Sequence, residues 1–106
     1  MYKIIVYVPC ESVDSVKRAL FDSGAGKIGN YEQCCWQSEG IGQFKPGEGS
    51  DPFIGVVGKV EQIKETKLEL VCTEQCIKAA ITSMLVAHPY EQPAYQIIPF
   101  FTLENL

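Results

Sequence analysis

Alternation of residue type is clearest in residues 62–72, and it is typical of a strand with two unlike faces. Successive side chains of an extended chain point to opposite sides, so the alternation separates one set from the other. The two sets are Thr66, Leu68, Leu70 and Cys72 on one face, and Glu65, Lys67 and Glu69 on the other. This segment is the clearest predicted strand.

Three further segments have the composition of strands. Residues 2–8 are rich in β-branched and aromatic residues, are apolar on both faces and end at Pro9, which predicts a central strand. Residues 31–38 predict a second strand. Residues 95–100 predict the last one, and Pro99 places it at a sheet edge because proline has no N–H to donate to a neighbour.

Apolar residues recur with helical spacing in two places. The first predicted helix has Ser12 as its N-cap and ends at Gly24. The second has Thr73 as its N-cap and ends before Pro89. Their apolar stripes are Val13, Val16, Ala19 and Leu20 in the first, and Ile77, Ala80, Ile81, Met84 and Leu85 in the second.

The predicted order is strand, helix, strand, long loop, strand, helix, strand. This order is that of the split βαβ arrangement, an α+β ferredoxin-like βαββαβ sandwich with the first and third strands in the centre. The stretch of residues 40–58 contains six of the nine glycines and joins strands two and three. It predicts a long protruding loop or a ragged hairpin, with short extended pieces around Gln43–Lys45 and Phe53–Val57. We predict one domain over residues 1–106, because this length suits a single hydrophobic core.

Charge and cysteine content narrow the class of protein. The formal net charge is -4 and the lysines are scattered, which argues against binding to nucleic acid and to anionic membranes. The apolar run at the N-terminus is too short for a membrane span and lacks the cleavage site of a signal peptide. Five cysteines, an odd number, fit reduced thiols, so we expect a cytoplasmic protein.

A glycine-rich connection follows the first predicted helix, at residues 24–30. It has the spacing of neither the P-loop nor the dinucleotide fingerprint, and it follows a helix instead of opening one. One interpretation is that these glycines form a turn after the helix, because glycine adopts a positive φ at little cost. The alternative is that a ligand contacts their backbone N–H groups, which no side chain shields. The residues that this ligand would contact are Gly24, Gly26 and Gly29.

Residues 88–95 combine two prolines, two tyrosines, a carboxylate and the only histidine of the chain. The prolines make this segment a rigid corner. His88 suits the end of a helix, where its ring can form local hydrogen bonds; a contact with a ligand or a weak metal site with Glu91 is the alternative. Tyr90 has two interpretations: its ring packs against other apolar groups at the corner, or it contacts a ligand. The candidate ligand-binding residues of the corner are His88, Tyr90 and Glu91.

The cysteines do not form a metal-binding pattern. Cys72 and Cys76 have C-x₃-C spacing, but a closed zinc site usually needs two close pairs. Cys34 and Cys35 are adjacent and would point to opposite faces of a strand. We expect buried, inert thiols, with a reactive Cys76 at the start of a helix as the alternative. No nucleophile-elbow motif is present. We therefore predict no catalytic residue, no metal ligand and no cofactor.

Three motifs resemble, in the same order, the small inserted domain of the Nif-three-like (YqfO-like) family. These motifs are GAGKIGNY at residues 24–31, GIGQFKP at residues 40–46 and HPYEQPAY at residues 88–95. The likeness covers residues 2–100. This chain has Gln92 and Gln96 where the family more often has Glu and Asp, which weakens the expectation of an acidic metal site.

The resemblance implies a fold similar to that of the PII signalling proteins and of CutA, the divalent-cation tolerance protein. Those proteins are ferredoxin-like trimers with a long loop between strands two and three. The resemblance also implies that the full-length proteins of this family have a dinuclear metal centre in a second, larger domain. No part of this sequence resembles that larger domain.

We therefore expect a stand-alone binding or regulatory module rather than an enzyme. It would self-associate, with a trimer favoured, and bind a small ligand or a divalent cation between subunits, near residues 24–29 and 88–91. One alternative is a metal-dependent hydrolase in which ligands from a neighbouring subunit join His88 and Glu91. The other is a structural domain that docks on a partner through its edge strands and its apolar tail.

Overall fold

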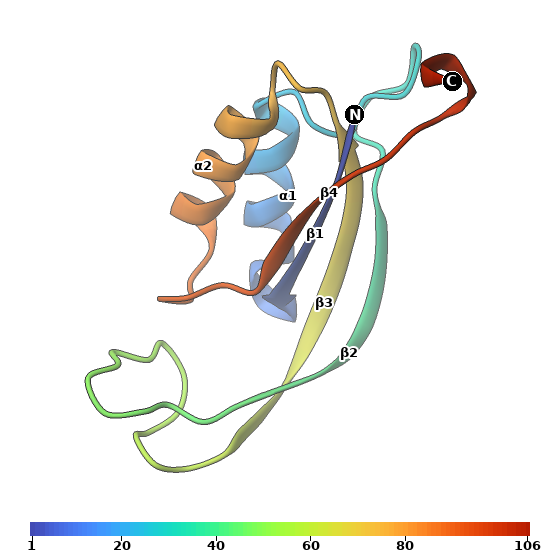
Figure 1. Ribbon diagram of the computed structural model, residues 1–106. Coiled ribbons are helices and arrows are strands. Elements are labelled where there is room, and N and C mark those ends of the chain that lie inside the picture. The colour runs from blue at the N-terminus through green and yellow to red at the C-terminus, as the bar shows by residue number, and fades with distance from the viewer.

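The computed structural model describes all 106 residues and has the predicted order of elements (Figure 1). The helices and strands are β1 (Tyr2–Pro9), α1 (Val13–Asp22), β2 (Trp36–Phe44), β3 (Glu61–Cys72), α2 (Ile77–Ala87) and β4 (Tyr95–Pro99). Two short 3₁₀ turns, Cys10–Ser12 and Leu103–Asn105, complete the chain. The predicted α+β ferredoxin-like sandwich is confirmed.

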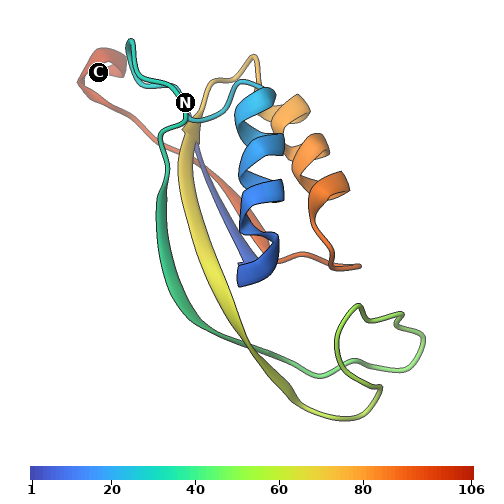
Figure 2. The ribbon, with the colours of Figure 1, turned by 180° about the vertical axis from the view of Figure 1, so that it is seen from behind.

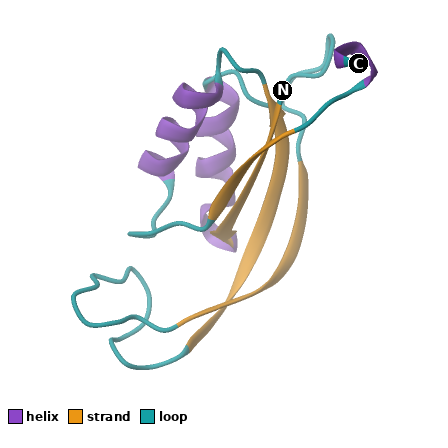
Figure 3. Ribbon diagram, in the orientation of Figure 1, coloured by secondary structure: helices purple, strands orange, loops and turns teal.

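The four strands form an antiparallel sheet in the order β2-β3-β1-β4 (Figure 3). As predicted, the first and third strands lie in the centre and the other two lie at the edges. The burial of β1 follows from this position: Ile4, Val6 and Val8 are fully buried, and Ile5 on the opposite face is nearly so. The proline of β4 pairs at the last position of that strand, at a sheet edge.

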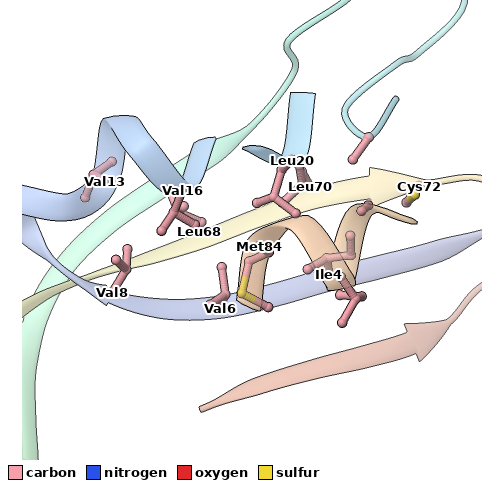
Figure 4. Close-up of a cluster of buried hydrophobic side chains, with 13 residues drawn as sticks. Ile4, Val6, Val8, Val13, Val16, Leu20, Leu68, Leu70, Cys72 and Met84 are labelled. Atoms are coloured by element: carbon pink, nitrogen blue, oxygen red, sulfur yellow. The ribbon is translucent and has the colours of Figure 1, made fainter. Parts of the chain in front are cut away.

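Both helices pack on the same face of the sheet, and no element covers the other face (Figures 1 and 2). The core lies between the two layers, where Met84 of α2 and Leu20 of α1 meet Val6 and Leu68 of the central strands (Figure 4). Full burial of such a side chain contributes about 1.5–3 kcal/mol to stability. Neither helix has the length and apolar character needed to cross a bilayer.

The hairpin of β2 and β3 extends beyond the helices, and the loop at its end turns back toward the segment that follows α2 (Figures 1 and 2). Of the two predictions for the stretch from residue 40, the hairpin is confirmed for its first part, and the extended piece expected around Phe53–Val57 forms no strand. Gly40 pairs with Glu65 and Gly42 with Ile63, so β2 continues to Phe44 and the loop spans residues 45–60. Pairing with the long β3 compensates for the low strand propensity of these glycines.

The start of β2 also differs from the prediction. A strand was expected from residue 31, but the ladder begins at Trp36. Ile28 and Tyr31 instead form a tight turn with two mutual backbone hydrogen bonds, and Gln33 has a positive φ of 56°. A residue with that backbone conformation cannot continue a strand.

The start of α2 lies about one turn later than predicted. Thr73 is not the N-cap, because its carbonyl accepts a hydrogen bond from the Cys76 N–H in a turn that precedes Ile77. Cys76 takes the N-cap position instead. Ser12 does precede α1 as predicted, although its side chain makes no capping hydrogen bond.

Candidate functional site

His88 joins the end of α2 to the end of the β1–β4 ladder. Val6 and Tyr95 are the last residue pair of that ladder. One residue further along β1, the Tyr7 N–H donates to the Ala94 carbonyl, 3.1 Å away. The Tyr7 carbonyl has no strand partner on this side, and the His88 ring supplies one: Nε2 lies 2.7 Å from the oxygen. The imidazole N–H thus takes the place of the amide that a neighbouring strand would supply, and it satisfies the Tyr7 carbonyl.

The second ring nitrogen of His88 is also used. The Tyr90 N–H donates to Nδ1 at 3.1 Å, so Nδ1 is the acceptor and Nε2 carries the proton. His88 is only 5% exposed. Burial lowers its pKa below the usual value, against the opposing effects of the Tyr7 carbonyl and the Glu65 charge. Both ring nitrogens of His88 are therefore used within the chain, and its lowered pKa favours the neutral ring.

Tyr90 lies at the centre of a small aromatic group. Its ring centroid is 4.9 Å from that of His88, 6.1 Å from that of Phe44 and 6.5 Å from that of Phe53. Its hydroxyl donates to Glu65 Oε2 at 2.8 Å. Burial, together with this hydrogen bond and the Glu65 charge, raises the pKa of Tyr90, so the hydroxyl stays protonated. Tyr90 therefore connects the corner to β3, to the end of β2 and to the long loop.

The glycine at position 42 makes room for the Glu65 carboxylate. A Cβ on Gly42 would overlap this carboxylate, whereas a Cβ on Gly40 would meet nothing within 4 Å. Both glycines lie on the face of the sheet opposite the helices, the same face as Glu65. The glycine of the GIG motif that the site requires is therefore Gly42.

Glu91 connects the corner to the tip of the long loop. Both of its carboxylate oxygens lie 3.2 Å from the Asp51 backbone nitrogen and accept its N–H. Residues 91 and 51 are far apart in the sequence, and the ribbon shows the loop close to the corner in both views (Figures 1 and 2). The hydrogen bond of Glu91 and the ring contacts of Tyr90 therefore dock the loop on the corner.

A cavity of about 340 Å³ lies between the docked loop, the corner and the hairpin. Its volume is within the range typical of small-molecule sites. Its lining consists of Tyr7, Gln43, Phe44, Lys45, Pro46, Gly47, Ser50, Pro52, Phe53, Ile54, Glu65, Tyr90, Glu91, Gln92 and Ala94. Tyr90 and Glu91, both candidates from the sequence, line this cavity, and His88 lies behind it without lining it.

The glycine connection lies at the other end of the sheet. The Gly26 N–H donates to the carbonyl of Val71, which pairs near the start of β1. The Gly24 N–H donates to the Phe21 carbonyl, so neither group is bare. Gly29 belongs to the turn between residues 28 and 31. Within one chain the structure does not bring these glycines to the corner.

Several lining residues were not among the candidates from the sequence. Phe44, Phe53, Tyr7 and Glu65 come from four separate segments that meet only in the folded chain. A useful signal was present for Glu65: it alternates with core residues in β3, opposite a stretch with glycine at every second position. Only one of these two glycines, Gly42, is the position that the carboxylate fills, and the pattern alone does not say which.

The expectation of buried thiols holds for Cys72 alone, because the other four cysteines are half-buried, two of them, Cys35 and Cys76, against the core. All five are free, and Cys72 is buried in the core, where burial raises its pKa. Burial likewise raises the pKa of Cys35. No group of three or more histidine, cysteine, aspartate or glutamate side chains that could hold a metal ion occurs in the chain.

His88 predicts a pH dependence of stability. Because its folded pKa lies below 6.5, the unfolded chain binds more protons between the two values, so stability falls as the pH drops through this range. Urea unfolding from about pH 7.5 to about pH 5.5 should show a loss of up to about 1.4 kcal/mol per pH unit in the wild type. His88→Gln should flatten this slope. Equal slopes in the two proteins would contradict the assignment.

Gly42→Ala and Gly40→Ala form a matched pair. The first displaces the Glu65 carboxylate and breaks its hydrogen bond with Tyr90, which should cost about 1–3 kcal/mol of unfolding free energy. The second meets open space and should be neutral or stabilising by about 0.5–1 kcal/mol, because glycine is unfavourable within strands. Chemical denaturation measures both. Equal effects would show that Glu65 does not need the bare position.

Comparison with known proteins places the chain among relatives much longer than itself. No protein-family model matches it. It is 50% identical over 97 residues to the GTP cyclohydrolase 1 type 2 homolog of Bacillus subtilis, covering 92% of this chain and 26% of that protein. It is 46% identical over 99 residues to the homolog of Halalkalibacterium halodurans, covering 93% and 27%. The chain thus spans about a quarter of the length of the curated relatives that it matches.

Solved structures show the same relation. The Bacillus cereus protein related to NIF3 matches with a TM-score of 0.82 and 38% identity, over 95% of this chain and 26% of that one. CutA1 from Pyrococcus horikoshii matches with a TM-score of 0.69 over 97% of this chain and 86% of that one; at 20% identity, this likeness concerns the fold alone. The resemblance seen in the motifs is confirmed: the chain is a homologue of one segment of the Nif-three-like proteins and has the CutA-like fold.

Proposed function

We propose that residues 1–106 form a single CutA/PII-like module that binds a small molecule in the cavity between the long loop and the corner. The docking of the loop on the corner carries this proposal. Glu91 and Tyr90 hold the loop in place, and the half-open space beneath it presents hydroxyl, amide and carboxylate groups on an apolar lining. A mostly apolar cavity with a few placed polar groups is the usual form of a ligand site.

The chemistry of the site supports binding rather than catalysis. The only histidine uses both ring nitrogens for backbone hydrogen bonds, so it is not available as a general base. A hydrolase-like activity would need ligands from outside this chain, because no three metal-ligating side chains gather within it. We therefore propose no enzymatic activity for this segment, although its relatives are named as homologs of a GTP cyclohydrolase.

We further propose that the module self-associates through the uncovered face of the sheet and its edges. Large apolar side chains are exposed there, including Trp36 at 69% and Ile98 at 42%. Gly24, Gly26 and Gly29 would join the ligand site only if a neighbouring copy brought them to it. A trimer in the cytoplasm remains our prediction from the resemblance and the cysteine count.

Light scattering and an NMR fragment screen on the same sample test this function. We expect a mass of two or more chains of 11.8 kDa each, and fragments whose chemical-shift changes cluster at Phe44, Phe53 and Tyr90. Tyr90→Ala should abolish these changes, because it removes the ring that joins the loop to the corner. Tyr31→Ala, at an exposed position outside the cavity, serves as the control. A monomer in which fragments bind elsewhere would overturn the proposal.

A further inference from the structure

Glu65 lies where two hollows of the open sheet face meet. It lines the cavity under the loop, and also a second hollow of about 360 Å³ beside β2; Tyr7 and Ala94 border both. One carboxylate oxygen, Oε2, accepts the hydrogen bond of Tyr90. The other oxygen, Oε1, lies against Gly42, which lines the second hollow and not the first, and it accepts no hydrogen bond from this chain. The site thus holds a fixed carboxylate with one free oxygen.

The rest of the lining favours positive charge. Phe44, Phe53 and Tyr90 present aromatic rings, whose faces attract cations. Glu91, whose carboxylate accepts the Asp51 N–H, adds a second negative charge to the lining. The single cation in the lining, Lys45, is exposed on the loop, where water screens its charge.

A metal ion fits this arrangement less well than an organic cation. Calcium and magnesium need several oxygen ligands, and the chain gathers no group of three acidic, histidine or cysteine side chains. Aromatic walls give a hard metal ion no ligand, whereas they pack against the carbon skeleton of an organic amine and attract its charge.

We propose that the cavity selects an organic cation, a small molecule with a protonated amine or guanidinium on an apolar body. The charged group lies where the two hollows meet and donates to Glu65 Oε1, and the apolar body packs against Tyr90, Phe44 and Phe53 under the loop. This inference rests on the proposed function, since it assigns a chemical class to the ligand of the same cavity.

Three probes of similar shape and different charge test the inference: benzylamine, benzyl alcohol and benzoate. Titrations followed by ¹H–¹⁵N NMR should show benzylamine binding at Phe44, Phe53 and Tyr90 at least about tenfold more tightly than the alcohol, because a hydrogen bond to a charged group adds this much. Benzoate should bind most weakly. Glu65→Gln keeps an acceptor for the Tyr90 hydroxyl and should remove the preference for the amine.

Glu69→Gln is the matched control, because Glu69 lies on the same face of β3, outside this cavity, in an ion pair with Lys3. It should keep the preference for benzylamine. Equal binding of the three probes in the cavity, or a preference that survives in Glu65→Gln, would overturn the inference and leave the proposed ligand site standing. Absence of shifts at the cavity residues with all three probes would overturn both.

Discussion

The hydrogen bond between the His88 ring and the Tyr7 carbonyl is the constraint on which the site depends. It fixes the end of α2 against β1 at the point where the β1–β4 ladder stops. The other ring nitrogen then fixes the Tyr90 amide and so places the tyrosine ring over Glu65. A buried, neutral imidazole suits this role because it donates on one side and accepts on the other. A charged ring would lose the acceptor.

From this anchor the site extends outward in two contacts. The Tyr90 ring packs between Phe44 and Phe53, while the neighbouring Glu91 accepts the Asp51 N–H. Each contact alone is modest, because a hydrogen bond contributes about 0.5–1.5 kcal/mol and an aromatic pair about the same. The two contacts involve adjacent residues, Tyr90 and Glu91, of a corner that prolines make rigid. Together they position the long loop, which lies at the end of the hairpin and far from the core.

The order of elements could be predicted because each has a local pattern of its own. The alternation in β3 and the apolar run of β1 identify central strands without knowledge of their neighbours. The second half of β2 has no such pattern, since Gly40 and Gly42 are typical of loops, and only pairing with β3 makes this stretch extended. Likewise, Tyr90 and Glu91 stand out in a dense motif, whereas Glu65 and Phe53 enter the site through long-range contacts.

Amide hydrogen exchange at Asp51 tests most directly whether the loop is docked on the corner. We expect this amide to be protected in the wild type, and Glu91→Ala to raise its exchange rate about tenfold, the loss expected from one hydrogen bond. The Ser50 amide, which donates to Gly47 within the loop, should change much less. An Asp51 amide that already exchanges at the rate of an unstructured peptide in the wild type would contradict the docked loop.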